Sequence, residues 1–332
     1  MVLMIGLAAV ALSTAMVFSY LVFIWWLDRY EREPFWMVLL VFVWGGVIAT
    51  ALGCTISLLM SVPAAMVLPS VYTDFFSTVV AAPLAEEFTK GLVFAILVLT
   101  PHLDNETDGL IYGAAAGLGF AVVENLLYFM ATAAVGPEVF FATVVARTLF
   151  TSLVHAISSA LLGYTVGYVR HRKLTPWLWT LPIVGFGLAV ANHALWNLLA
   201  LVSGSGLIGD TMALGALGLG FGLVVVMSIV MFLLTQFSLS REQKIIKKYL
   251  ADEAAQGILP GDHAQIIPSW RKRRKKGWLP PHVPQKAYVE AATLLAFRRY
   301  QQDTAAPRHK ARYGEQVRDY RQKVRQALGG RA

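Results

Sequence analysis

Long apolar blocks dominate this chain and constrain its fold more than any other feature. A helix needs about 20 mainly apolar residues to cross roughly 30 Å of hydrocarbon. Hydrophobic residues make up 57% of the 332 residues and charged residues only 14%, against about 25% in soluble domains. The sequence therefore predicts an all-α, polytopic membrane helix bundle. We expect seven spans, at about 3–27, 35–60, 75–99, 109–130, 139–169, 177–202 and 211–238.

The basic residues between these blocks predict the orientation. Arg29 and Arg32 follow the first span, and Arg170, Arg172 and Lys173 follow the fifth. Most other Lys and Arg residues lie after the seventh span, and the loops after spans two, four and six contain none. Because loops rich in Lys and Arg stay in the cytoplasm, we expect the N-terminus outside and the tail inside. The prediction is a multi-pass protein of the cell membrane.

The chain divides in composition into a membrane bundle, residues 1–238, and a basic cytoplasmic tail, residues 239–332. Helical patterning recurs in three segments of the tail, Lys244–Gln256, Gln285–Gln302 and Arg312–Leu328. The sequence therefore predicts a helical tail attached to the bundle.

A run of six basic residues lies in the tail between Trp270 and Trp278. It consists of Arg271, Lys272, Arg273, Arg274, Lys275 and Lys276. An anionic leaflet attracts such a run by about 1 kcal/mol for each basic residue near the surface. We expect contact with anionic lipid, and the alternative is a solvated stretch that reinforces the topology. No nucleic acid is expected as a partner, because no recognition fold is visible.

Three charged residues, Glu86, Glu87 and Lys90, lie inside the third predicted span. Unpaired, they would cost about 8 kcal/mol on insertion scales, so we expect them to be paired or used. Lys90 is four residues from Glu86 and three from Glu87, and both spacings make neighbours on a helix. The geometry favours a pair between Glu86 and Lys90 without deciding it, and leaves the other glutamate for a different task.

Three further spans carry ionisable or amide residues near mid-depth. They are Glu124 and Asn125 in span four, Arg147 and His155 in span five, and His193 and Asn197 in span six. Helix rise places these residues and the glutamate pair between the midplane and the outer half of the bilayer. We therefore expect a shared polar cavity that opens more easily outward. Arg147 is expected to be structural, or a second counter-ion for the acids.

Two histidines and several carboxylates in a wet pocket point to hydrolysis by either of two routes. In one, His155, His193 and Glu124 hold a divalent metal and a spare carboxylate acts as the base. In the other, a glutamate activates water, and a histidine or Asn197 stabilises the oxyanion. The single cysteine, Cys54, excludes an internal disulfide and a cysteine-based metal site. A proton- or ion-coupled transporter using the same acids is the alternative function, and a non-catalytic scaffold is a third.

The motifs around these residues resemble those of the PrsW-type intramembrane proteases, which are distantly related to the CAAX prenyl proteases. Pro83-Leu-Ala-Glu-Glu-Phe-Thr-Lys90 resembles the family's Glu-Glu-x-x-Lys motif, and Phe120-Ala-Val-Val-Glu-Asn125 resembles its Phe-x-x-x-Glu-Asn motif. His155 and His193-Ala-Leu-Trp-Asn197 resemble its later histidine positions. The resemblance covers roughly residues 35–238.

The resemblance implies an intramembrane metallopeptidase that cleaves a membrane-anchored protein, such as an anti-sigma factor in regulated signalling. It also implies a divalent metal, with zinc the first candidate. Carried over by motif, the catalytic residues would be Glu86, Glu87, Glu124, His155 and His193. Supporting roles would fall to Lys90, Asn125 and Asn197.

Overall fold

The structure is a computed structural model, and it describes residues 2–170, 176–206, 209–305 and 307–329. Every regular element within these ranges is a helix, which confirms the all-α prediction. Arg172 and Lys173, used above to predict orientation, lie outside the described residues. The chain forms two compact units. The first contains Met1–Leu27, Glu33–Arg170 and Pro176–Leu233, and the second contains Asp28–Arg32, His171–Thr175 and Leu234–Ala332.

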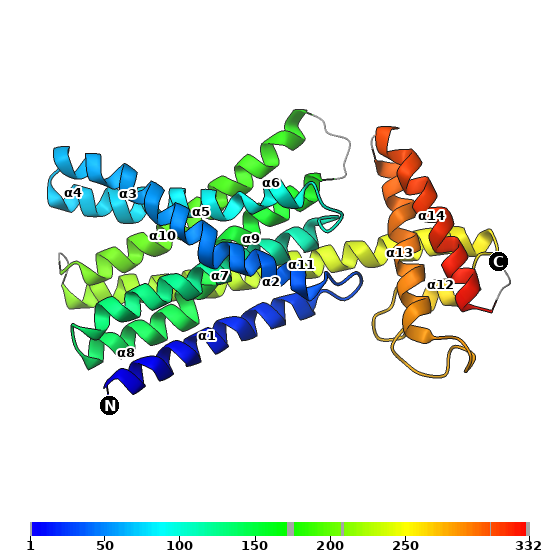
Figure 1. Cartoon of the computed structure of the whole chain (residues 1–332), viewed down its shortest axis with the longest axis horizontal. Coiled ribbons are helices and arrows are strands. Elements are labelled where there is room, and N and C mark those ends of the chain that lie inside the picture. The colour runs from blue at the N-terminus through cyan, green and yellow to red at the C-terminus, as the bar shows by residue number, and fades with distance from the viewer. Residues whose placement is uncertain (1, 171–175, 207–208, 306, 330–332) are drawn as a thin grey trace. The chain divides into compact units, whose positions relative to one another are not determined.

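The first unit is a bundle of α-helices with short π-helical and 3₁₀ segments (Figure 1). Its elements are α1 (Val2–Leu27), α2 (Phe35–Val43), η1 (Trp44–Ala49), α3 (Thr50–Val67), α4 (Ser70–Phe75), η2 (Phe76–Ala81), α5 (Ala82–Gly91), α6 (Val93–Leu97), α7 (Glu106–Ala133), α8 (Pro137–Ala146), η3 (Arg147–Thr151), α9 (Ser152–Val169), η4 (Pro176–Trp179) and α10 (Thr180–Gly204). The long helix α11 (Asp210–Ala255) contributes to both units.

Six helices within the described ranges are long and apolar enough to cross a membrane. They are Met4–Leu27, Phe35–Val67, Glu106–Ala133, Pro137–Val169, Thr180–Gly204 and Asp210–Ala255. These correspond to six of the seven predicted spans. The predicted span at 75–99 coincides with the unbroken helical stretch of α4, η2 and α5, residues 70–91, followed after Leu92 by the short helix α6. This segment carries the charged residues of the third span, which lower its apolarity.

Glycines allow the two central helices, α7 and α9, to pack with their backbones close together. A Cβ at Gly113 would lie 2.3 Å from the carbonyl oxygen of Ser159, and one at Gly117 would lie 2.2 Å from that of His155. No side chain fits at such distances, so this approach requires glycine. The packing aligns the second half of α7, which carries Glu124, with the start of α9, which carries His155.

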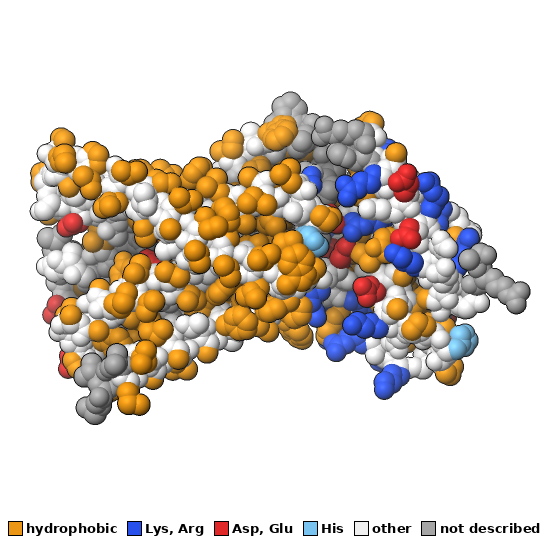
Figure 2. All heavy atoms as spheres, in the orientation of Figure 1, with side chains coloured by type: hydrophobic (Ala, Val, Ile, Leu, Met, Phe, Trp, Pro, Cys, Tyr) orange, Lys and Arg blue, Asp and Glu red, His pale blue; other side chains and the backbone are white. Residues whose placement is uncertain are grey.

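The exterior of the first unit is apolar. On the face drawn in Figure 2, hydrophobic side chains cover most of its surface. Exposed examples from four different helices are Leu12, Leu59, Ile183 and Phe232. A soluble protein rarely exposes so large an apolar surface, and this arrangement agrees with a bundle surrounded by lipid.

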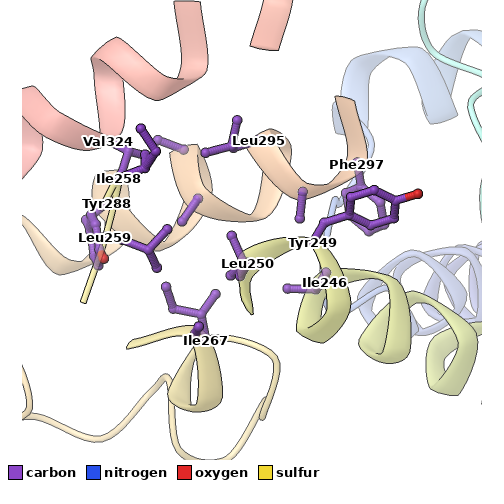
Figure 3. Close-up of a cluster of buried hydrophobic side chains, with 14 of the residues drawn as sticks. Ile246, Tyr249, Leu250, Ile258, Leu259, Ile267, Tyr288, Leu295, Phe297 and Val324 are labelled. Carbon is purple, nitrogen blue, oxygen red and sulfur yellow. The ribbon is translucent and has the colours of Figure 1, made fainter. Parts of the chain in front are cut away.

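The second unit has an interior core of the soluble type (Figure 3). Its helices are the end of α11, α12 (His263–Ile266), α13 (Gln285–Thr304) and α14 (Pro307–Ala327). Ile246 and Leu250 on α11 pack with Tyr288 and Leu295 on α13, and all four are fully buried. Lys and Arg side chains gather on its surface in Figure 2. The predicted boundary between residues 238 and 239 falls inside α11.

Five of the six residues in the predicted lipid-binding run, all except Arg273, are exposed. Arg273 donates a hydrogen bond to the carbonyl oxygen of Arg29, and its guanidinium lies 4.9 Å from the centroid of the Tyr30 ring. Both partners come from Asp28–Arg32, which belongs to this unit. Arg273 is thus partly buried against its own unit, and lipid contact by the run stays a prediction.

Candidate metal and catalytic site

The candidate site lies inside the first unit, where α5, α7, α9 and α10 each contribute polar side chains. Pro83 lies in the first turn of α5, directly after the π-helical segment η2, and a proline inside a helical stretch removes a backbone hydrogen bond. The five predicted catalytic residues are Glu86, Glu87, Glu124, His155 and His193. The structure gathers all five: His193 contacts Glu86 and Glu87, His155 contacts Glu124, and the two imidazole centroids lie 4.8 Å apart. They are buried, except for Glu124, whose side chain is 18% exposed.

Both carboxylate oxygens of Glu87 are fully engaged. Oε1 lies 2.8 Å from Nζ of Lys90 and 3.0 Å from Nδ1 of His193. Oε2 accepts a hydrogen bond of 2.8 Å from Oγ of Ser159. A carboxylate bonded to one ring nitrogen of a histidine fixes the tautomer and orients the other nitrogen. Glu87 therefore positions His193 and has no free oxygen for a reaction.

Lys90 pairs most closely with Glu87, which differs from the pairing that the helix spacing favoured. Its Nζ is 3.7 Å from Oε2 of Glu86, against 2.8 Å from Glu87. The ammonium also lies 3.0 Å from Nδ1 of His155 and 4.0 Å from the ring centroid of Phe120. These contacts across helices, which spacing within one helix does not describe, draw Lys90 towards Glu87.

Glu86 is the glutamate left available. Its Oε2 is buried and has no hydrogen-bond partner among the described residues. It lies 3.8 Å from Nε2 of His193. Ligand atoms of Glu86, His155 and His193 all lie within 4.8 Å of one another. A buried carboxylate oxygen without a partner is costly unless it has another role, and this one faces two imidazoles.

Glu124 contacts a histidine and an arginine through the same oxygen. Oε2 lies 2.7 Å from Nε2 of His155 and 2.7 Å from Nη2 of Arg147. Neither contact has hydrogen-bond geometry, and all three atoms lack a hydrogen-bond partner among the described residues. The ion pair agrees with the expectation that Arg147 is a counter-ion for the acids. Charges brought together without well-directed hydrogen bonds are typical of a site that binds something further.

The supporting amides are found at different distances from this centre. Asn125 accepts a hydrogen bond from Nε of Arg147 and donates one to Oγ of Ser152, at 3.1 Å each. Asn197 donates to the carbonyl oxygen of Thr78 at 2.9 Å. Asn125 therefore holds Arg147 in place, and Asn197 joins α10 to η2, the π-helical segment before α5.

Two features of the site escaped sequence reasoning. Ser159 bonds directly to Glu87, but serines are common at packing faces of membrane helices and their spacing carries no signal of this kind. The second is η3, the π-helical turn Arg147–Thr151. Such turns occur often at functional sites, and this one carries Arg147 towards Glu124. Apolar sequence around it gave no indication of a π turn.

The residues present fit a divalent metal. Glu86, His155 and His193 offer a two-histidine, one-carboxylate donor set, with ligand atoms within 4.8 Å of one another, that suits zinc. For His193 the fit is direct, because the bond from Nδ1 to Glu87 leaves Nε2 free to coordinate. For His155, Nδ1 faces the Lys90 ammonium, which can only donate. With Nδ1 accepting, the ring carries its proton on Nε2, 2.7 Å from Oε2 of Glu124. Metal at Nε2 of His155 would therefore require that proton to leave, as is usual when metals bind. The sequence-based set contained Glu124, and the geometry brings Glu86 into that place.

The family follows from a comparison with known proteins. The model of the PrsW family intramembrane metalloproteases matches residues 33–235, a range that contains every site residue described above. This chain belongs to the PrsW family. It is therefore a protease of the metallopeptidase class and a multi-pass membrane protein.

Named relatives agree with the family assignment. The chain is 32% identical over 178 residues to Protease PrsW of Geobacillus kaustophilus, covering 52% of this chain and 71% of that protein. It is 31% identical over 145 residues to Protease PrsW of Bacillus subtilis, covering 43% of this chain and 60% of that protein. The latter match spans less than two thirds of the Bacillus protein. No solved structure matches the chain.

Proposed function

We propose that this PrsW-family protein hydrolyses a peptide bond in a membrane-anchored protein, with an anti-sigma factor as the substrate class that its motifs suggest. The observation that carries the proposal is the difference in hydrogen bonding between the two adjacent glutamates. Glu87 is saturated by Lys90, His193 and Ser159, while Glu86 keeps a buried oxygen free beside two imidazoles. A relay of protons in a transporter would not require a metal-type donor set, and the family assignment does not favour one.

In this proposal Glu86, His155 and His193 hold a divalent metal, with zinc preferred for two imidazoles and one carboxylate. When bound, the metal supplies Lewis acidity and lowers the pKa of water. Glu87 orients His193 through Nδ1, and Lys90 balances the charge of Glu87. Apolar helices exclude bulk water around the centre, which strengthens every electrostatic interaction within it.

Glu124 is proposed as the general base and acid. Its carboxylate lies on the other side of His155 from Lys90, next to the cavity that is described below. Four groups at the centre, Glu86, Glu124, His155 and His193, are not fully hydrogen-bonded. Among them Glu124 is the acid that lies outside the metal-type cluster. Arg147 pairs with it and positions it, and Asn125 holds Arg147. Proton transfer by such a group contributes about 10²- to 10⁴-fold to the rate.

Two variants distinguish a metal ligand from a general base. Purified full-length Glu86→Gln is expected to lose both bound zinc and cleavage, whereas Glu124→Gln keeps the zinc and loses cleavage by about 10²- to 10⁴-fold. Zinc content is measured by mass spectrometry, and cleavage by comparing membrane proteins in cells that express each variant. Glu138→Gln, an exposed acid on α8, is the matched control. Full cleavage by a correctly inserted Glu86→Gln protein would reject the proposal.

We also propose that the exposed basic residues of the tail contact anionic lipid. They are Arg271, Lys272, Arg274, Lys275 and Lys276. The attraction should fall as ionic strength rises, because it acts over about one Debye length. The contact is measured in the full-length protein by crosslinking these residues to phosphatidylserine in vesicles, at low and at high salt. Crosslinking that does not change with salt would contradict this proposal.

A further inference from the structure

A cavity of about 330 Å³ adjoins the candidate site in the first unit. Glu124 and His155 form part of its wall, so it reaches the same atoms that make up the proposed reaction centre. The remaining walls come from η2, α7, α8, η3, α10 and α11. The volume lies at the lower end of the range for ligand pockets, about 300–1,000 Å³. It therefore suits part of a polypeptide more than a whole folded segment.

The walls of the cavity differ in chemistry. One side is polar, with Glu124, Arg147 and Thr151. The side formed by α10 and α11 is apolar, with Trp196, Leu199, Leu217 and Phe221 among its residues. A peptide unit needs polar partners when it leaves water, and an apolar side chain gains from burial. A polypeptide whose backbone faces Glu124 and whose side chain faces α11 satisfies both requirements.

We propose that this cavity is a specificity subsite, which takes one large apolar side chain of the substrate next to the scissile bond. The inference rests on the proposed proteolytic function and adds the class of residue that the site selects. A small side chain would leave space unfilled beside the apolar wall. A charged side chain would lie against that wall without a polar partner. The enzyme should therefore prefer aromatic or long aliphatic residues at one position beside the cut.

A neighbouring apolar groove supports a polypeptide as the occupant. Leu149, Leu153, Val224 and Phe232 are among the residues that line it, and these lie on η3, α9 and α11. Groove and cavity meet at a pair of aromatic rings, Phe150 from the groove and Phe221 from the cavity, with centroids 4.2 Å apart. A membrane-anchored segment could lie along this groove with one side chain entering the cavity.

Two small residues on α11, Gly220 and Ala216, set the depth of the subsite. Both line the cavity. A Cβ at Gly220 would lie 3.4 Å from Cζ3 of Trp196 and 3.7 Å from Cβ of Leu199, which are ordinary contact distances. A larger side chain at 220 would therefore project towards residues of the apolar wall and occupy the space. Gly218, two residues earlier on the same helix, has open space around its Cβ position and does not line the cavity.

The experiment compares full-length wild type with Gly220→Leu and the matched control Gly218→Leu in cells. New N-termini of membrane proteins are identified by mass spectrometry, and termini also present with Glu86→Gln are subtracted. Gly220→Leu is expected to reduce cleavage at sites with a large apolar flanking residue by about 10- to 200-fold. Sites with a small flanking residue should change less than the bulky ones, and Gly218→Leu should retain the wild-type pattern.

Two results distinguish failure of the inference from failure of the proposed function. A folded Gly220→Leu protein with the wild-type preference would reject the subsite while leaving proteolysis intact. Termini that are the same in wild type and Glu86→Gln would reject proteolysis, and the subsite with it. Ala216→Leu is the second variant if Gly220→Leu fails to accumulate in the membrane. Thermal unfolding in detergent verifies that each variant is folded.

Discussion

Both units of this protein bury a glutamate among basic groups, but they satisfy it differently. In the second unit, Glu253 is 0% exposed and accepts two hydrogen bonds of 2.7 Å from Arg321, with Arg299 3.1 Å away. In the first unit, Glu86 is 9% exposed and its Oε2 has no hydrogen-bond partner among the described residues. A buried acid with every oxygen hydrogen-bonded serves stability, whereas one whose oxygen has only longer ionic contacts, next to imidazoles, is available for chemistry.

The two units also differ in where their apolar and charged side chains lie. The first unit exposes apolar side chains and buries its ionisable ones, and the second buries a cluster around Leu250 and Leu295. Lipid provides no hydrogen bonds to a charged group, so in the bundle charges gather inside. Water favours charges at the surface of the second unit. A buried charge in the bundle therefore says more about function than one in the tail.

Replacing Glu87 with Gln should affect metal binding, cleavage and stability together, because Glu87 is at once a structural partner and the residue that orients His193. Loss of such an orienting carboxylate typically costs about 10- to 100-fold in metal affinity or activity. The expected result is a fall of this size in both zinc affinity and cleavage, together with a lower thermal unfolding temperature, since Lys90 loses its closest partner. Zinc titration of the purified protein provides the measurement.

The control for Glu87 is Ser159→Ala, which removes one donor and leaves both ion contacts of Glu87 intact. It should cost only about 1 kcal/mol. If Glu87→Gln bound zinc and cleaved like wild type, the distinction between an orienting and a reactive glutamate would be lost.

Replacing Glu253 with Ala should affect stability alone. Removing one partner of a buried ion pair typically costs about 3–5 kcal/mol, since Arg321 and Arg299 would lose their shared acceptor. Hydrogen exchange of the α13 and α14 amides in the full-length protein should become faster, with zinc content unchanged.

Lys323→Ala supplies the comparison for Glu253. This residue pairs with Asp319 at 2.7 Å, and both side chains are about half exposed, at 51% and 55%. Such surface pairs contribute about 0–1 kcal/mol, so exchange should barely change. Loss of zinc in Glu253→Ala, with Lys323→Ala normal, would show that the two carboxylates do not have separate roles.

The smallest expected effect concerns Asp28, a buried acid of the second unit. Burial raises the pKa of Asp28 to about 6 from its usual 3.8, against the opposing effect of a backbone hydrogen bond from Tyr30 and the charge of Arg32. The folded state thus holds this proton more tightly than the unfolded state. Stability should be highest below pH 4 for this group and should fall as pH rises to about 6, by up to about 3 kcal/mol.

Asp28→Asn keeps the shape of the side chain and removes its titration. The variant should therefore be more stable than wild type above pH 6, and the difference should vanish near pH 4. Thermal unfolding in detergent at a series of pH values measures it. Equal pH profiles for the two proteins would contradict the assignment.

Helix periodicity and charge position predicted much of the site. Glu86, Glu87, Glu124, His155 and His193 were identified because ionisable residues in apolar spans are costly and rarely accidental. The spacing of Lys90 could not decide its partner, since residues three and four positions away both face it. The choice depends on His155 and Phe120, which approach Lys90 from α9 and α7.

The sequence by itself determined the class of fold, six of the membrane spans and the set of ionisable residues from which the candidate site is built, because the cost of charge in lipid can be read along one dimension. The tertiary structure decided which glutamate is saturated, how Arg147 is positioned, and that Asp28–Arg32 belongs with the tail. These outcomes depend on contacts between helices far apart in the chain. Hydrogen-bond direction and distance in such contacts are fixed by packing, which periodicity does not encode.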